Sequence, residues 1–455
     1  MTSSVSAASA DASARRSAPG LSLLLQHTAD AVRAVLQGRS LAEGLPEVPA
    51  ALRPGVQALT FHALRHLGLA RALVSHLADR SPEPAVQALL IVAVSLLVAP
   101  ADGVRYAPHT VVNQAVEAAR QHRRLQRQAG FINACLRRLL REQTDLMAEV
   151  AHDPQARHHH PAWWVERVRR DHPQDWESVL QASQQPGPMT LRVNRRRIDR
   201  SAYARRLSEA GMASLPTGDD GLVLAQPCAV EGLPGWSEGL VSVQDAAAQM
   251  AAGLLLDGQD WGPQHRVLDA CAAPGGKTAH LLERADAQVL ALDADAARAR
   301  RIDDTLQRLG LQDRAEVKVA DAADTAAWWD GRPFDAILLD APCTASGIVR
   351  RHPDVRWLRR ESDVAALAVQ QRRLLDALWP LLKPGGRLLY ATCSVFRAEG
   401  EDQMQAFVAR HTDARRQPSA GHLLPGAGRP AGQFNDNPPG GHDGFFYARL
   451  DKPAA

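Results

Sequence analysis

Two cysteines near the end of the chain carry side chains that could do covalent chemistry. Cys343 ends the stretch Leu338-Leu339-Asp340-Ala341-Pro342-Cys343, and Cys393 lies within Tyr390-Ala391-Thr392-Cys393-Ser394. Each cysteine follows an apolar run that is typical of a buried parallel strand. The carboxyl ends of parallel strands meet at one edge of a sheet, where open α/β folds bind their ligands. This placement favours covalent group transfer over a structural role for the two thiols.

A third strand end supplies a loop suited to a nucleoside cofactor. Val267-Leu268-Asp269 is followed by Ala270-Cys271-Ala272-Ala273-Pro274-Gly275-Gly276-Lys277-Thr278. A phosphate-binding P-loop needs a glycine at the position of Cys271, and the dinucleotide fingerprint G-x-G-x-x-G is absent. What remains is a short loop whose glycines let the backbone approach a ligand closely.

Acidic residues follow the next two predicted strands. Asp293 comes after Val289-Leu290-Ala291-Leu292, where an acid typically accepts hydrogen bonds from ribose hydroxyls. Asp321 is placed to bind an adenine amino group or a methionine ammonium group. Each aspartate alone could equally be a helix N-cap. The glycine loop, Asp293 and Asp321 follow three successive predicted strands. Together these strand ends favour S-adenosylmethionine over ATP or NAD as the cofactor.

The two thiols suit methylation of a pyrimidine carbon. Cytosine C5 is a poor nucleophile, and a thiolate that adds to C6 makes C5 enamine-like until elimination restores aromaticity. An acid must also bind the N3/N4 edge as charge develops, and Asp340 is the candidate. Either thiol alone could be a buried apolar side chain, as we expect for Cys135 and Cys228.

Composition limits the class of protein. The chain has 455 residues, enough for two or three domains, and 53 Lys+Arg against 50 Asp+Glu leave a net charge of only +3. Five cysteines without a Cys-x-x-Cys pair argue against a disulfide scaffold or a zinc site. The longest apolar stretch, residues 85–99, is too short to span a bilayer and predicts a core helix. We expect a cytoplasmic monomer with no metal and no membrane partner.

The elements that must position these residues fall in the last part of the chain. Residues 1–20 predict a disordered leader, residues 21–150 an all-α domain, and residues 151–240 a bridging α+β segment. Residues 241–455 alternate strands and helices, which predicts a Rossmann-like, doubly wound parallel sheet. The Gly/Pro-rich stretch between His411 and Pro439 is expected to be a loop. Strands are expected at Arg266–Asp269, Gln288–Leu292, Ala315–Ala320, Ala336–Leu339, Arg387–Tyr390 and Gly444–Leu450.

Two segments are locally basic. One is a series of arginines around residues 130–136, and the other is the stretch 191–197. Each is either a solvated face or a surface that contacts phosphates, whose binding would weaken with salt. The arginines of the first segment are Arg120, Arg123, Arg124, Arg127, Arg137, Arg138 and Arg141.

At these residues the chain resembles the RNA cytosine-5 methyltransferases and, within them, the bacterial ribosomal RNA small-subunit methyltransferase B family. The resemblance covers nearly all of the chain after residue 20, and the helical region resembles NusB, an RNA-binding fold. The most specific motifs are 269–278, Asp340-Ala341-Pro342-Cys343, Arg350-Arg351-His352-Pro353-Asp354, Ala391-Thr392-Cys393-Ser394, Asp443-Gly444-Phe445-Phe446-Tyr447-Ala448 and Val243-Gln244-Asp245-Ala246-Ala247-Ala248-Gln249.

The resemblance implies roles for individual residues. Cys393 would be the nucleophile and Cys343 would assist product release, with Asp340 and Lys277 completing the catalytic set. DNA cytosine-5 methyltransferases use the Pro-Cys thiol as nucleophile, so the presence of both thiols favours RNA. The S-adenosylmethionine site would comprise Cys271, Ala272, Ala273, Pro274, Gly275, Gly276, Lys277, Asp293, Asp321 and Asp340.

The expected function is therefore methylation of C5 of a specific cytosine in 16S ribosomal RNA through a cysteine–C6 adduct. The target base must leave its stack, which favours naked or partly assembled RNA. The same chemistry on tRNA or at another ribosomal RNA site stays open. So does a non-catalytic RNA-binding assembly factor.

Overall fold

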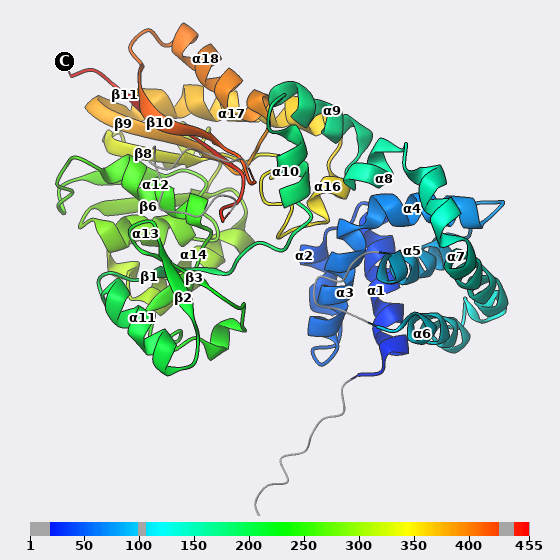
Figure 1. Cartoon of the computed structure of the whole chain (residues 1–455). Coiled ribbons are helices and arrows are strands. Elements are labelled where there is room, and N and C mark those ends of the chain that lie inside the picture. The colour runs from blue at the N-terminus through cyan, green and yellow to red at the C-terminus, as the bar shows by residue number, and fades with distance from the viewer. Residues whose placement is uncertain (1–18, 99–105, 427–440, 455) are drawn as a thin grey trace, which may run out of the picture. The chain divides into compact units, whose positions relative to one another are not determined.

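The computed structural model describes residues 19–98, 106–426 and 441–454. All but the last two residues of the predicted leader, 1–20, lie outside this part of the chain. The chain divides into two compact units, Met1–Ala156 and Arg157–Ala455. Figure 1 shows the helices of the first unit and the strands and helices of the second.

The first unit is helical, as predicted. Helix α5 is apolar all round its surface, and such a helix must be enclosed by others. Helices α1, α3, α4, α6 and α7 all pack against it. The helices are α1 (Leu21–Leu36), α2 (Leu41–Gly44), α3 (Arg53–Arg65), α4 (Leu67–Leu77), α5 (Pro84–Val98), α6 (Pro108–Gln121) and α7 (Ala129–Val150), with 3₁₀ turns at Leu45–Glu47 and Gln126–Gln128.

A small antiparallel sheet follows the helical unit along the chain. Its strand order is β2-β3-β1-β4, and helix α11 packs against β2 and β3. The elements are α8 (Pro154–His158), α9 (Ala162–Asp171), α10 (Trp176–Ala182), β1 (Thr190–Val193), α11 (Arg200–Glu209), β2 (Ser214–Thr217), β3 (Gly221–Leu224), a 3₁₀ turn at Val230–Gly232 and β4 (Val241–Val243).

The main sheet has seven strands in the order β10-β11-β9-β8-β5-β6-β7. Strands β5 to β9 are parallel, as predicted, and β11 and β10 add an antiparallel edge. The strands are β5 (Arg266–Asp269), β6 (Gln288–Asp293), β7 (Ala315–Val319), β8 (Phe334–Asp340), β9 (Leu382–Thr392), β10 (Arg415–Leu423) and β11 (Phe445–Asp451).

Strand β10 corrects one prediction. The stretch between His411 and Pro439 was expected to be a loop, yet residues 415–423 pair with β11 across a register shift between Gln417 and Gly421. The strand is polar and contains Pro418, which an edge strand tolerates because one of its sides needs no partner. Residues 427–440 of the expected loop lie outside the described part of the chain.

Helices cover both faces of the main sheet, because its strands alternate apolar side chains between the two faces. One core joins the sheet to α12, α13 and α14, and the other joins it to α15, α17 and α18. The helices are α12 (Ala246–Leu256), α13 (Gly276–Arg284), α14 (Ala296–Leu309), α15 (Thr325–Trp328), α16 (Val355–Leu358), α17 (Glu361–Leu378) and α18 (Glu401–Arg410), with 3₁₀ turns at Gln312–Arg314, Trp379–Leu381 and Arg397–Glu399.

Within the described residues, no helix has both the length and the apolar character that crossing a bilayer requires.

Candidate functional site

Predicted catalytic and cofactor-binding residues meet at the carboxyl edge of the main sheet. Asp269, Asp293 and Asp340 are the last residues of β5, β6 and β8, and Cys393 directly follows β9. These four strands are parallel neighbours in the order β9-β8-β5-β6. Their ends therefore lie side by side.

The predicted cofactor loop runs from β5 into α13. Gly275 has φ +93°, and a Cβ there would lie 3.0 Å from the Ile302 Cα, so this position needs glycine. The Ala273 N–H donates to Asp293 Oδ2 over 3.3 Å, and the Thr305 hydroxyl donates to the Pro274 carbonyl over 2.9 Å. The loop is thus fixed between the end of β6 and helix α14.

The site holds three acids and two cations. Lys277 Nζ contacts Asp340 Oδ2 at 2.6 Å, Arg298 contacts Asp293 Oδ2 at 3.4 Å, and Asp269 lies beside these pairs. Burial raises the pKa of Asp269 to about 7; the Thr278 hydroxyl opposes this shift, and the charges of Asp340 and Asp293 add to it. The Asp269 Oδ1 atom is buried without a hydrogen-bond partner in the described residues. An anionic edge with a spare buried acceptor fits a cationic ligand such as S-adenosylmethionine, with its sulfonium and ammonium groups.

The raised pKa of Asp269 gives a testable pH dependence. An unfolded aspartate has a pKa near 3.8, so the protonated side chain stabilises the fold fully below that value. This contribution is lost as the pH rises through about 7, because the folded state must then hold a buried charge. In urea denaturation, we expect Asp269→Asn to gain stability relative to the unsubstituted protein between pH 5 and pH 8. If the free energy of unfolding changes with pH in the same way for both proteins, this expectation is contradicted.

Two predicted cofactor residues differ in their surroundings. Asp321 lies two residues beyond β7, is half-exposed and forms an ion pair with Arg373 at 2.6 Å. A ligand would have to share or replace that cation. Cys271 is partly buried in the loop, and burial, followed by the charge of Asp340, raises its pKa. Their roles in binding stay predictions.

The two thiols lie next to each other. Cys343 Sγ and Cys393 Sγ are 3.4 Å apart, although the residues are separated by 50 positions. The hydrogen bond shared with Cys393, followed by burial, raises the pKa of Cys343 far above its usual range. Cys343 is therefore a thiol at neutral pH and can donate a hydrogen bond to Cys393 Sγ.

Sequence reasoning missed a buried acid behind the thiols. Glu399 is fully buried and accepts hydrogen bonds from Thr344, Ser394 and Gln371. Nothing in the sequence distinguishes it from Glu401, two residues on, whose side chain is 21% exposed and pairs with Arg416.

Three of the motifs named above come together in one ion-pair network. Arg350 and Arg351 both contact the carboxylate of Asp443 at 2.5 Å, and Arg351 also contacts Asp245 at 2.7 Å. The Gly444 N–H donates to the Gly347 carbonyl over 2.9 Å, an approach that leaves no room for a Cβ at either glycine. The loop that follows Cys343 is therefore fixed to the start of β11.

The arginines of the basic stretch 191–197 mostly form ion pairs and hydrogen bonds within the molecule. Arg192 is buried; it pairs with Glu283 at 2.8 Å and donates to the Gly276 carbonyl over 2.6 Å. Arg196 and Arg197 donate to carbonyls at the ends of α13 and α14. The phosphate-contacting alternative is wrong for Arg192, whose charge the neighbouring acid neutralises.

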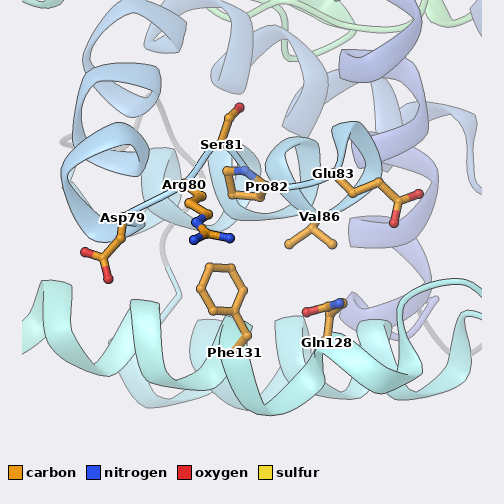
Figure 2. Close-up of a pocket in the computed structure, with 8 residues that line it drawn as sticks. All are labelled: Asp79, Arg80, Ser81, Pro82, Glu83, Val86, Gln128 and Phe131. Atoms are coloured by element: carbon orange, nitrogen blue, oxygen red, sulfur yellow. The ribbon is translucent and has the colours of Figure 1, made fainter.

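The first unit has an open pocket of its own. It lies between α7 and the connection from α4 to α5, and Figure 2 shows the Phe131 ring facing the Arg80 guanidinium group across it. Pro82 and Val86 supply further apolar lining, Gln128 directly precedes α7, and the acids Asp79 and Glu83 also line the pocket. The Phe131 side chain is 37% exposed.

Comparisons with known proteins match most of the chain. A family model described as 16S rRNA methyltransferase RsmB/F matches residues 255–451, an RsmF/B-like ferredoxin-like domain matches 160–231, and the NusB family matches 15–141. Ribosomal RNA small subunit methyltransferase B of Pseudomonas syringae pv. tomato is 44% identical over 442 residues, which cover 94% of this chain and 96% of that protein. The protein of the same name from Citrobacter koseri is 42% identical over 439 residues, covering 93% of this chain and 97% of that protein. The solved structure of PH0851 has a TM-score of 0.71 at 23% identity, covering 94% of this chain and 99% of that one, which shows the fold.

The parallel sheet, with its glycine loop and acidic strand ends, defines an S-adenosylmethionine-dependent methyltransferase, here preceded by a NusB-like domain. At the identities given above, the chain belongs to the ribosomal RNA small subunit methyltransferase B family. The resemblance stated from the motifs is confirmed, as are the fold class and the cofactor.

Proposed function

We propose that this enzyme methylates C5 of a cytosine in 16S ribosomal RNA through a covalent adduct between Cys393 and C6 of the base. The observation that carries the proposal is the thiol pair, 3.4 Å apart at the same sheet edge as the Lys277–Asp340 pair. Burial opposes the shift, but the charge of Asp340 and its hydrogen bond, followed by the charge of Cys393, raise the pKa of Lys277. The names of the relatives support 16S ribosomal RNA as the substrate and the cytoplasm as the compartment.

S-adenosylmethionine, when bound, supplies an electrophilic methyl group. The Cys393 thiolate adds to C6, which raises the electron density on C5. Asp340, held by Lys277, binds the N3/N4 edge of the base while charge develops there. In the last step C5 loses its proton, the C5–H electron pair re-forms the C5–C6 double bond, and the S–C6 pair returns to sulfur.

Cys343 is suited to the last step. The main cause of its raised pKa is the hydrogen bond with Cys393. That cause is removed once Cys393 has become a neutral thioether, so Cys343 can release its own proton to solvent more readily and then, as a thiolate, take the proton from C5.

Methyl transfer from labelled S-adenosylmethionine to unmethylated 16S RNA tests the proposal, and bisulfite sequencing locates the product. Parallel reactions with total tRNA and 23S RNA test the same chemistry on other substrates. If only tRNA or only 23S RNA is labelled, that RNA is the substrate instead of 16S RNA. If no RNA is labelled, the result favours a non-catalytic assembly factor.

We also propose that the pocket of the NusB-like domain takes an unpaired base of the RNA. An exposed aromatic ring beside a guanidinium group offers a stacking surface. Arg123, Arg124 and Arg127 are exposed nearby in sequence, and no ion pair is found for them among the described residues. These arginines would contact phosphates.

Replacement of Phe131 by alanine together with Arg127 by glutamate should raise KM for RNA at least about tenfold and leave kcat unchanged. The expected loss of affinity for RNA combines the loss of one stacked base and of one phosphate contact. The matched control is Arg71→Glu, which makes the same charge change at an exposed position of α4. An unchanged KM at two salt concentrations, or an equal loss in the control, would argue against the pocket.

A further inference from the structure

Glu399 connects the two loops that carry the thiols. Its carboxylate accepts from the Thr344 N–H over 2.8 Å and from the Thr344 hydroxyl over 2.5 Å. It also accepts from the Ser394 hydroxyl over 2.6 Å. Thr344 directly follows Cys343, and Ser394 directly follows Cys393. One side chain therefore binds the neighbours of both reacting residues.

Further hydrogen bonds fix Glu399 itself. Gln371 on α17 donates to Glu399 Oε1 over 3.2 Å and to the Pro342 carbonyl over 2.9 Å. The main-chain carbonyl of Glu399 accepts from the Tyr390 and Thr392 hydroxyls. The residue is fully buried, and burial raises the pKa of its carboxyl group, while the hydrogen bonds from Ser394, Thr344 and Gln371 oppose this shift. Keeping an acid here is costly unless every donor stays in place.

Glu399 matters more for the position of the loop that carries Cys343 than for the position of Cys393. Residues 341–347 form no helix or strand. Cys393, by contrast, follows β9, whose last residue Thr392 pairs with Phe446 of β11. The carboxylate makes two bonds to the Cys343 side and one to the Cys393 side.

We propose that Glu399 is a positioning residue that holds Cys343 in place for release of the methylated RNA. The inference rests on the proposed covalent function. Without the Glu399 carboxylate, the loop of Cys343 would move away from Cys393, while addition of Cys393 to the base would continue. The S–C6 bond would then persist because removal of the C5 proton is slowed.

The test compares Glu399→Ala with two other variants. We expect Glu399→Ala to lower kcat about 100-fold, as misplacement by about 1 Å can do, to accumulate the protein–RNA adduct, and to leave KM for S-adenosylmethionine unchanged. Glu399→Gln keeps the acceptor for the Thr344 N–H, and both hydroxyls can rotate to accept from its amide, so it should restore most of the turnover. Thr344→Val removes one hydroxyl donor and should accumulate adduct in an otherwise intact fold, so it serves if Glu399→Ala does not fold.

The matched control is Asp335→Asn, at the opposite end of β8 from Asp340. Asp335 accepts from the Arg266 N–H and from Lys383, so its loss weakens the same strand away from the thiols. This variant should melt at a lower temperature and accumulate no adduct.

The possible results separate the two proposals. Wild-type turnover without adduct in Glu399→Ala and Thr344→Val would overturn the role of Glu399 alone. Adduct in Asp335→Asn to the same extent would also overturn it, because general loosening would then explain the effect. Absence of adduct even in Cys343→Ala would overturn the proposed covalent function.

Discussion

Cys393→Ala is expected to lower methyl transfer to RNA by more than about 1,000-fold, since the loss of a covalent nucleophile removes the whole reaction path. Without addition at C6, C5 stays a poor nucleophile, whatever the position of the methyl donor. The substituted side chain is small and partly buried, and the fold should keep its melting temperature within a few degrees. Single-turnover labelling measures the loss directly.

The matched control for this loss is Cys228→Ala. Cys228 is also partly buried, and it packs in the core of the small sheet with no predicted role in the reaction. Its replacement should leave turnover unchanged. If Cys393→Ala instead stops after one round with accumulated adduct and Cys343→Ala abolishes the first round, the two thiols exchange their proposed roles.

Cys343→Ala is expected to stop the reaction after one round and to hold nearly every enzyme molecule as a covalent complex with RNA. The alanine cannot take the C5 proton, so the S–C6 bond formed by Cys393 is not broken. A denaturing gel with labelled RNA measures the shifted band, and mass spectrometry of the digested complex should place the link at residue 393.

The double variant Cys343→Ala/Cys393→Ala provides the control, because it removes the nucleophile and should form no complex. A covalent band that survives in the double variant would identify another nucleophile. The band should also require S-adenosylmethionine and decrease on addition of competing unlabelled 16S RNA.

The parallel part of the fold could be predicted because its signals are local. An apolar run followed by a cysteine or an acid marks a strand end, and Asp269, Asp293 and Cys393 all lie where such runs end. Since parallel strand ends share one edge, the sequence alone could bring these residues together. The 3.4 Å approach of the thiols could not be read in this way, because it depends on how two loops pack.

The features that were missed depend on contacts between distant residues. Glu399 looks like an ordinary surface acid until Thr344, 55 positions away, is packed against it. Arg192 sits in a basic stretch, and only the fold places Glu283 beside it. Strand β10 lacks an alternating apolar pattern and forms because β11 offers it an edge to pair with. In each case tertiary packing decides what local sequence leaves open.

The buried contact between Arg192 and Glu283 limits how far the enzyme can be shortened. Arg192 lies on β1, far upstream of the main sheet in sequence, yet it also holds the first carbonyl of α13. A fragment beginning at Val241 would keep every strand of the main sheet but leave Glu283 as a lone charge in the interior. Removing one partner of a buried ion pair typically lowers the free energy of unfolding by about 3–5 kcal/mol. The minimal catalytic piece must therefore start upstream of β1, so the small sheet is an integral part of the methyltransferase rather than a detachable module.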